Sequence, residues 1–345
     1  MQNLINKYKK IRKKQFLKSS FNDKYAFVGI GNHSLNNLYP VLDYLKVDLK
    51  YIVTKSEETV KTINDNYKNI KGTTNLDKVL NDKSINGIFV SATPSAHFEL
   101  AEKILKADKN LFIEKPPCLT LEELDKLQEA EKHSKGNAFI GLQKRFAPVF
   151  SQLYSKVKSK KVNYYKLEYY SGHYPEGDTL TDLFIHPLDI ACYMFGKPEI
   201  ELIRKIKCNK GVETILLELK HPENIYGHLE LSTDFWWARG NEKITVNTEK
   251  QIFYSDGINS LKYIDKPKSL MNVPLEKVKS PVLSEHYLYQ KNNFLPVREH
   301  NDLYAAGYFK EIESFLNVCE HGGDNISTIE SVRPVFELID NIRKK

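Results

Sequence analysis

Two separate groups of side chains in this sequence have the types and spacing needed for acid–base chemistry. The first is the run Phe-Ile-Glu-Lys-Pro-Pro at residues 112–117, where an apolar segment of strand character ends in a carboxylate, an ammonium group and prolines. If this segment is a strand of an open parallel sheet, Lys115 lies at the carboxyl edge, where such sheets bind ligands. A lysine there can be a general acid, a substrate clamp or a solvated surface charge.

The second group lies in an apolar segment, residues 183–195, that reads as a helix. Asp182, His186 and Asp189 are spaced four and three apart, so on a helix their side chains share one face. Ionisable groups on a buried helix cost free energy unless they are paired or face a cleft. Pro187 fits only the first turn of a helix or a kink, so we expect this helix to begin near Asp182. A functional stripe and a satisfied core histidine both remain open here.

A glycine turn, Gly-Ile-Gly-Asn-His-Ser at residues 29–34, follows a short apolar strand and precedes a helical segment. Gly29 can make the tight turn, and Gly31 lets the backbone approach a pyrophosphate at a helix N-terminus. Ser34 stands in the place of a third glycine, and Pro40 interrupts the following helix. The motif predicts a phosphate-binding turn, although an ordinary tight turn fits the residues of the motif as well.

Strand-like and helix-like runs alternate from residue 24 to residue 142, which predicts crossover units and a parallel sheet. We expect strands at residues 25–28, 49–53, 87–90, 111–114 and 138–142, and helices at 35–45, 57–68, 97–107 and 121–134. The third and fourth of these strands are apolar on both faces, as buried parallel strands should be. The region therefore reads as a Rossmann dinucleotide-binding domain.

The end of the second strand predicts which nicotinamide cofactor fits. An acid there would hydrogen-bond a ribose 2′-hydroxyl and repel a 2′-phosphate. The residues present are Thr54, Lys55 and Ser56, one cation and two hydroxyls. This favours NADP(H), with NAD(H) as the alternative.

Residues 143–345 show a different pattern, in which most strand-like runs follow one another without helices between them. Gln143 to Pro148 form the hinge, and we expect strands at 162–170, 201–207, 213–219, 225–231, 243–246 and 251–254 with antiparallel pairing. An open sheet face is a plausible surface for a homo-oligomer. Two helices, at 303–320 and 329–344, close the chain.

Composition fits a soluble, cytoplasmic enzyme. The 345 residues exceed one ordinary core, 41% are hydrophobic, and no apolar run approaches the ~18 residues of a membrane span. The four cysteines are far apart and form no Cys-x-x-Cys pair, so we expect neither a metal site nor a disulfide framework.

The net charge of +7 is concentrated at the start of the chain. The first 24 residues hold eight Lys and Arg side chains against Asp23, so residues 25–345 are formally neutral. We therefore expect no nucleic-acid partner for the body. Residues 1–23 form a basic arm or helix that could contact an acidic partner, a membrane surface or nucleic acid; we prefer an amphipathic helix that packs on the body or on a neighbouring subunit.

Four blocks of the sequence together resemble the Gfo/Idh/MocA oxidoreductases, which include glucose-fructose oxidoreductase and inositol dehydrogenase. They are the turn at 29–33 with Pro40 beyond it, Glu114-Lys115-Pro116, the crossover at 141–146, and the segment 182–189 with Gly196. The match covers nearly everything after Lys24. It departs from the family at Ser34 and at Pro94, where the proline's register varies among relatives.

The resemblance implies an α/β fold: a Rossmann domain over residues 24–142, followed at 143–345 by a substrate-binding and oligomerisation domain with a large open, mainly antiparallel sheet. It also implies reversible hydride transfer to or from a carbinol of a sugar, polyol or nucleotide sugar. By resemblance, the catalytic lysine, histidine and aspartate fall on Lys115, His186 and Asp182. The predicted cofactor-binding residues are Gly29, Gly31, Asn32, His33, Thr54, Lys55, Ser56, Ala92, Thr93, His97, Glu114, Lys115, Gln143 and Arg145.

Alcohol oxidation removes a hydride from carbon and a proton from oxygen, so a general base must accompany the cofactor. His186, with an ordinary pKa near ~6.5, suits that task, and Lys115 would hydrogen-bond the developing alkoxide. Either of the two could make the final proton transfer. Aromatic candidates for stacking on the substrate are Tyr169, Tyr170, His173, Tyr174, Trp236 and Trp237. A redox-assisted glycosidase and a cofactor-binding regulatory protein without turnover are the alternatives.

Overall fold

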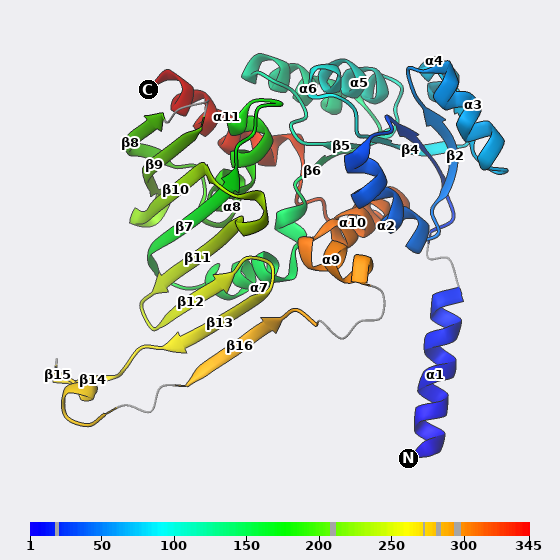
Figure 1. Ribbon diagram of the computed structural model, residues 1–345. Helices are drawn as coiled ribbons and strands as arrows, with labels where there is room; N and C mark the ends of the chain where they lie inside the picture. Colours follow the sequence, from blue (N-terminus) through cyan, green and yellow to red (C-terminus); the bar gives the residue numbers. More distant parts are fainter. Residues whose placement is uncertain (18–20, 208–211, 272, 281–283, 293–297) are drawn as a thin grey trace. The chain divides into compact units, whose positions relative to one another are not determined.

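The computed structural model describes residues 1–17, 21–207, 212–271, 273–280, 284–292 and 298–345. The chain divides into two compact units (Figure 1). The first consists of Met1–Cys118, Asp125–Gly141 and Ile312–Thr328. The second consists of Leu119–Leu124, Leu142–Glu311 and Ile329–Lys345. The division is therefore more interleaved than the single boundary predicted at residue 142, because a late segment of the chain belongs to the first unit.

The first unit is built on a six-stranded parallel sheet with the order β3-β2-β1-β4-β5-β6. Its strands are β1 (Lys24–Val28), β2 (Asp48–Val53), β3 (Lys71–Thr73), β4 (Ile85–Val90), β5 (Asn110–Glu114) and β6 (Ala138–Gly141). This is the strand order of a dinucleotide-binding Rossmann fold, in which the chain reverses direction across the sheet between β1 and β4. The predicted fold class of this region is confirmed.

The helices of the first unit follow the strands in alternation. They are α1 (Gln2–Leu17), α2 (Tyr39–Tyr44), α3 (Glu57–Asn66), α4 (Leu76–Leu80), α5 (Pro94–Lys106), α6 (Leu121–His133), which begins in the second unit, and most of α10 (Tyr308–His321). The helix predicted at 35–45 is instead a π-helical turn, Ser34–Leu38, followed by α2, with Pro40 in the first turn of α2. That position tolerates proline because its N–H would have no helical partner.

Stacked aromatic rings hold the core of the first unit together. Phe89, Phe112 and Phe139 lie on the neighbouring strands β4, β5 and β6, and all three are fully buried. Phe315 of α10 packs edge-on against each of them, with ring centroids 5.0, 5.7 and 5.9 Å apart. This packing explains why residues 312–328 belong to the first unit despite their late position in the sequence.

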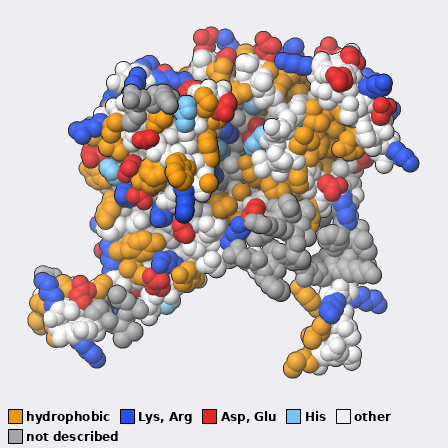
Figure 2. All heavy atoms as spheres, in the orientation of Figure 1, with side chains coloured by type: hydrophobic (Ala, Val, Ile, Leu, Met, Phe, Trp, Pro, Cys, Tyr) orange, Lys and Arg blue, Asp and Glu red, His pale blue; other side chains and the backbone are white. Residues whose placement is uncertain are grey.

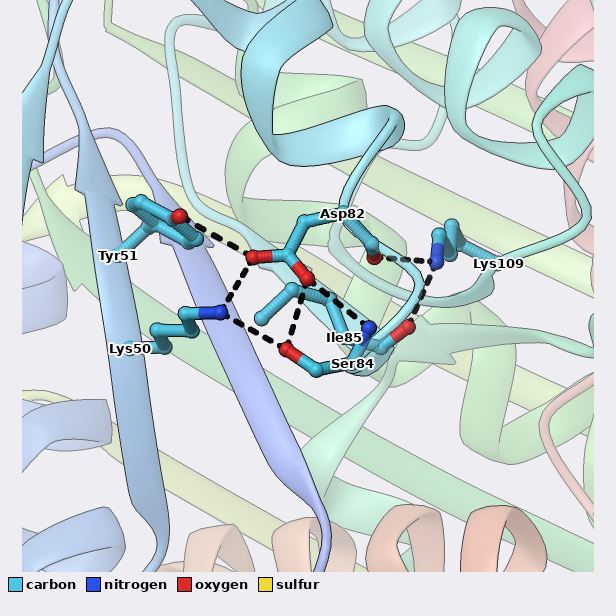
Figure 3. Close-up of polar contacts among 6 residues, drawn as sticks. All are labelled: Lys50, Tyr51, Asp82, Ser84, Ile85 and Lys109. Atoms are coloured by element: carbon cyan, nitrogen blue, oxygen red, sulfur yellow. Dashed lines mark hydrogen bonds and ion pairs between the residues drawn. The ribbon is translucent and has the colours of Figure 1, made fainter.

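A polar cluster lies at the amino-terminal edge of the same sheet, where its strands begin (Figure 3). The Asp82 carboxylate accepts hydrogen bonds from Lys50 Nζ (2.5 Å), Tyr51 Oη (3.1 Å) and the Ser84 hydroxyl (2.7 Å). Lys109 Nζ donates to the backbone oxygens of Asp82 (2.9 Å) and Ile85 (2.8 Å). The hydrogen bonds, led by that from Lys50, hold the pKa of Asp82 well below its usual range. The cluster fixes the turn into β4.

The second unit contains an eight-stranded mixed sheet with the order β16-β13-β12-β11-β7-β10-β9-β8. Its strands are β7 (Val162–Gly172), β8 (Glu199–Lys207), β9 (Glu213–His221), β10 (Ile225–Phe235), β11 (Asn241–Thr248), β12 (Gln251–Asp256), β13 (Ser260–Asp265) and β16 (Glu285–Gln290). The pair β7–β10 is parallel and the other neighbours are antiparallel. The predicted large, mainly antiparallel sheet is confirmed. A short hairpin, β14 (Ser269–Leu270) with β15 (Val273–Pro274), lies between β13 and β16.

The helices of the second unit are α7 (Pro148–Val157), α8 (Ile185–Phe195), α9 (Arg298–Ala306) and α11 (Ile329–Lys344). Tyr165 of β7 is buried and stacks on Phe195 of α8 at 4.4 Å, whereas the neighbouring Tyr164 is exposed. The sheet therefore has one face against helices and one open face. The helix predicted at 303–320 is interrupted at Gly307, where φ is +101° and a Cβ would lie 2.0 Å from the Gln143 oxygen.

Among the described residues, no helix is both long enough and apolar enough to cross a membrane.

Candidate active site

The glycine turn lies at the carboxyl end of β1, where the order of the strands reverses. Gly29 has φ +96°, and a Cβ there would lie 2.1 Å from the Ser91 oxygen, so only glycine fits. Its N–H donates to the Val53 oxygen at 2.9 Å, which ties the turn to the end of β2. A Cβ added at Gly31 would meet no described atom within 4 Å. The backbone of Gly31 therefore borders open space, as a phosphate-binding turn requires.

Ser34 has a structural role in the place of the third glycine. It is fully buried, its Oγ accepts the Gly31 N–H at 2.9 Å, and its hydroxyl donates to the Gly31 oxygen at 2.9 Å. The turn is thus closed by a side chain that a glycine would lack. The serine therefore stabilises the turn locally, which accounts for its presence in place of a glycine.

His33 connects this turn with the end of β5. Its Nε2 lies 3.2 Å from Oε1 of Glu114, which is almost fully buried, and its Nδ1 lies 3.1 Å from the Asn37 amide. Asn32, next to it, is exposed. Lys115 follows Glu114 at the carboxyl end of β5 and is half-buried. The predicted catalytic lysine and the predicted phosphate turn therefore share one edge of one sheet.

His97 has a structural position, and its contact with the cofactor stays a prediction. It is 1% exposed, its Nδ1 lies 2.7 Å from the Pro116 oxygen, and its Nε2 lies 3.3 Å from the Ala92 N–H nitrogen. Burial lowers the pKa of His97, which favours the neutral ring. In the tautomer with a proton on Nδ1, the ring donates to Pro116 and accepts from Ala92. His97 thereby joins the loop after β4 to the loop that carries Lys115.

The residues that follow β2 and β4 differ in how far their side chains are exposed to solvent. Thr54 donates its N–H to the Thr73 oxygen at 3.0 Å, and Ser56 caps α3 by accepting the Thr59 N–H at 3.2 Å. Lys55 between them is exposed, as is Thr93, which precedes α5. Of the Thr54–Ser56 group, Lys55 is the side chain best able to reach a ligand.

In the second unit, the predicted catalytic His186 lies in the first turn of α8 and is largely buried. Asp182 lies one turn earlier, in a π-helical turn over Leu180–Phe184. The Asp182 carboxylate accepts a hydrogen bond from Tyr174 Oη at 3.3 Å. A Cβ at Gly177 would lie 2.0 Å from Oδ2 of Asp182, so this glycine makes room for the carboxylate. Pro187 falls within the first turn of α8, as its missing N–H requires.

Arg145 and Gln143, both predicted to bind the cofactor, are buried inside the second unit. Arg145 donates from Nε and Nη2 to the two carboxylate oxygens of Asp189, at 2.8 and 2.5 Å, and from Nη1 to Ser331 Oγ at 2.8 Å. The Gln143 amide lies 3.4 Å from the Tyr308 hydroxyl. Arg145 therefore fixes α8 against α11, and its contact with the cofactor stays a prediction.

A pocket of about 300 Å³ opens at the edge of the large sheet where β7 ends and β11 begins. Tyr169, Tyr170 and Trp237, three of the predicted stacking residues, line it. Its polar lining includes Asn241, Glu242, Asp256 and Asn259. Sequence reasoning missed these four, because they lie on strands and a turn whose spacing carries no motif.

Charge is distributed unevenly in this pocket. Glu242 forms an ion pair with Lys144, whose ammonium also lies 4.9 Å from the centre of the Tyr169 ring. Asp256 is exposed at the turn between β12 and β13. Tyr174 connects the pocket with Asp182, since its ring contacts Trp237 and its hydroxyl donates to Asp182. The pocket and the proposed catalytic carboxylate therefore belong to one contiguous region of the second unit.

Each unit thus gathers its own share of the predicted site. The first unit brings Gly29, Gly31, His33, Glu114 and Lys115 to one sheet edge. The second unit brings Asp182 and His186 beside an aromatic and acidic pocket. The meeting of Lys115 with His186 stays a prediction.

The fold and the two half-sites define a class of protein with an NAD-binding Rossmann unit joined to a mainly antiparallel sheet unit. Residues 24–142 match the model of an oxidoreductase family with an NAD-binding Rossmann fold. This part of the chain is therefore similar to the Gfo/Idh/MocA oxidoreductases.

Several oxidoreductases are similar to this chain in sequence. Oxidoreductase P35 from Formosa agariphila is 24% identical over 46% of this chain and 56% of its own length. Myo-inositol 2-dehydrogenase from Thermotoga maritima is 21% identical over 62% of this chain and 71% of its own length. The matched part of the chain spans about half the length of the first curated relatives.

A crystal structure of a dehydrogenase from Chromobacterium violaceum has the same fold. It superimposes with a TM-score of 0.79 and 18% identity, and covers 93% of this chain and 94% of its own. The similarity therefore extends beyond the Rossmann unit to the large sheet.

Proposed function

We propose that this protein is an NAD(P)-dependent oxidoreductase that transfers a hydride between the nicotinamide and a secondary alcohol or ketone of a sugar, polyol or nucleotide sugar. The observation that carries the proposal is the position of Lys115 at the carboxyl end of β5, on the same sheet edge as the open turn at Gly31. The match of residues 24–142 to the oxidoreductase family and the inositol dehydrogenase among the relatives support it.

The residues present fit a dinucleotide. The open backbone at Gly31 leaves room for a pyrophosphate, and Lys55 and Thr93 are exposed at the ends of β2 and β4. When bound, the nicotinamide accepts or supplies the hydride. We infer a preference for NADP(H), because the exposed cation Lys55 suits a 2′-phosphate and no acid follows Val53 directly.

The chain's own side chains then handle the proton. His186 acts as general base toward the substrate hydroxyl, and Lys115 donates a hydrogen bond to the oxygen as negative charge develops there. Asp182, held by Tyr174, orients one of these two groups. Such acid–base assistance is worth roughly 10² to 10⁴ in rate.

The lining of the 300 Å³ pocket favours an uncharged substrate. Tyr170 and Trp237 offer apolar rings against which a sugar face can stack, while Asn241 and Asn259 offer amides for hydroxyl groups. Glu242 and Asp256 repel phosphates, and Lys144, the nearby cation, is already paired with Glu242. Neutral sugars and polyols therefore rank before nucleotide sugars.

The open face of the large sheet is a proposed homo-oligomer surface. Tyr164 and Tyr226 are directly paired on neighbouring strands and are half-exposed, and Leu202 lies on the same face. Exposed aromatic and aliphatic side chains on one sheet face are typical of subunit interfaces. A Tyr164→Lys/Tyr226→Lys variant should elute as a smaller species than the wild type in size-exclusion chromatography. An unchanged elution volume would reject this surface.

The central experiment combines cofactor titration with turnover. Binding of NADPH and NADH is followed by fluorescence, and a panel of neutral sugars, polyols and nucleotide sugars is then screened for cofactor-linked turnover. Lys115→Met should reduce kcat by on the order of 10² or more while cofactor affinity stays nearly unchanged. His186→Asn should act in the same way.

Two results would contradict the proposal. Retained turnover in Lys115→Met would remove the lysine from the mechanism. Tight cofactor binding without turnover of any compound in the panel would favour a regulatory protein, and substrate cleavage without net cofactor reduction would favour a redox-assisted glycosidase. Trp237→Ala tests the pocket separately, since it should raise KM for the substrate at least tenfold and leave cofactor affinity unaltered.

A further inference from the structure

Helix α1 (Gln2–Leu17) is 16 residues long and contains no acidic residue. It carries six Lys and Arg side chains, so most of the chain's net charge of +7 lies on it, and the proposed catalytic function does not use this charge. The first acid of the chain is Asp23, and residues 25–345 are formally neutral. A concentration of positive charge on one helix of an otherwise balanced protein points to a specific anionic partner.

The helix carries an apolar stripe that is open to solvent. Leu4, Tyr8 and Ile11 are spaced four and three residues apart, so their side chains follow one another along one face. They are exposed by 76, 61 and 49%. The stripe thus does not pack on the body of the chain, and packing on a neighbouring subunit, the other half of the expectation, stays a prediction. Figure 2 shows orange apolar and blue basic atoms of this helix at its surface.

Basic side chains flank the stripe. Lys9 and Lys10 are exposed and, at 100° per residue, point away from the Leu4–Ile11 line, whereas the exposed Lys7 borders that line. The helix thus has an apolar face and a cationic face, together with low overall hydrophobicity. This combination is typical of a helix that lies in the interface of a membrane, with its apolar face among the acyl chains and its lysines among the headgroups.

We propose that α1 docks the protein onto an anionic lipid bilayer as a peripheral, interfacial helix. The occupant of the stripe is then the headgroup–acyl boundary, and the lysines pair with anionic headgroups. Nucleic acid fits less well, because phosphates need only the cations and would leave the exposed aliphatic side chains of Leu4 and Ile11 without a partner. A neighbouring copy fits less well too, since the rest of the chain is formally neutral and offers no excess of acidic groups to match the six basic residues of α1.

The test is co-sedimentation of the full-length protein with large vesicles. One set contains phosphatidylcholine alone and the other equal parts of phosphatidylcholine and phosphatidylglycerol. The wild type should sediment with the anionic vesicles only, and raised salt should weaken this binding. Lys7→Gln/Lys9→Gln/Lys10→Gln should weaken it by about fivefold for each cation, or on the order of 100-fold in all.

A matched control removes the same charge elsewhere. Lys103→Gln/Lys106→Gln/Lys132→Gln changes three exposed lysines of α5 and α6 and should bind vesicles like the wild type. A second variant, Leu4→Ser/Tyr8→Ser/Ile11→Ser, keeps every charge but removes the stripe. It should lose at least tenfold in vesicle affinity, because the buried apolar area is gone.

Turnover in solution should be unchanged in all three variants, so a failure of the catalytic proposal is visible separately from a failure of this one. Wild-type protein that ignores anionic vesicles would overturn the proposal. So would equal losses in the α1 and control lysine variants, or undiminished binding of the serine variant. A serine variant that loses an oligomeric state, with no vesicle binding by the wild type, would assign the stripe to a neighbouring copy instead.

Discussion

The guanidinium of Arg145 and the carboxylate of Asp189 form a two-point hydrogen-bonded ion pair that is buried inside the second unit. Arg145 also donates to the Ser331 hydroxyl and backbone oxygen, and its guanidinium lies 5.0 Å from the Tyr193 ring centre. One side chain therefore ties the crossover after β6 to α8 and to α11. Asp189 is three residues from His186, so the pair fixes the helix on which the proposed base is mounted.

Asp189→Asn should destabilise the second unit by about 3 to 5 kcal/mol, because it leaves a buried guanidinium without its counter-charge. Chemical denaturation followed by circular dichroism measures this. Arg145→Met/Asp189→Leu, which removes both charges, should be far less harmful than the single change. The control is Asp340→Asn, which breaks a solvent-accessible pair with Lys344 on α11 and should cost at most about 1 kcal/mol. Equal effects of Asp189→Asn and Asp340→Asn would contradict a buried ion pair.

Much of the fold follows from sequence patterns that are local. The apolar runs at β4 and β5 and the glycine turn after β1 carry enough information to specify a parallel sheet, since buried strands must be apolar on both faces. Short elements such as β3 and α4, with three and five residues, are too brief to show a period and were not predicted. Phe315 was assigned to the wrong unit because its partners are distant in the sequence.

In the site, too, local features could be predicted from sequence and features that depend on distant contacts could not. Gly29 has a positive φ and Ser56 caps the helix that follows it, so both roles are local and could be expected from motifs. His97 and Arg145 could not be interpreted from sequence, because a buried hydrogen-bonded side chain and a ligand-binding one have the same residue type. Only the contacts with Pro116 and Asp189 distinguish the two.

Lys55 should decide the choice of cofactor. Lys55→Ala should weaken NADPH binding about tenfold, which corresponds to the roughly 1.5 kcal/mol of one charge-assisted hydrogen bond, and leave NADH binding unchanged. Fluorescence titration of both cofactors measures the two affinities. Lys71→Ala is the matched control, since Lys71 is exposed but begins β3 at the opposite edge of the sheet. A parallel loss of NADPH and NADH affinity would show that Lys55 does not meet a 2′-phosphate.

The Asp82 cluster should make the first unit sensitive to acid. The pKa of Asp82 is lower in the folded chain than its ordinary value near ~3.9, so its contribution is present above that pH and is lost as the pH falls further. Asp82→Asn should therefore cost about 2 kcal/mol at pH 7, and less below about pH 4. Denaturation at both pH values tests this, with the exposed Asp65→Asn as control. A difference that does not shrink in acid would exclude the cluster as its source.

His221 should give the second unit a pH dependence in a higher range. Its Nδ1 lies 2.7 Å from the Gly196 oxygen and its Nε2 lies 2.8 Å from the Tyr165 hydroxyl. The neutral ring therefore donates to Gly196 and accepts from Tyr165. Burial lowers the pKa of His221 to about 4. The folded chain then binds fewer protons than the unfolded chain between about pH 4 and the ordinary pKa near ~6.5, so stability falls as the pH drops through this range.

Between pH 7 and pH 5 this histidine should account for about 2 kcal/mol of lost stability. His221→Gln should be less stable than the wild type at pH 7, because the buried contact to Tyr165 is disturbed, but its stability should change less on acidification. His133→Gln, at an exposed position on α6, should follow the wild-type pH profile. Urea denaturation at a series of pH values compares the three proteins. Parallel profiles for the wild type and His221→Gln would mean that His221 is not the titrating group.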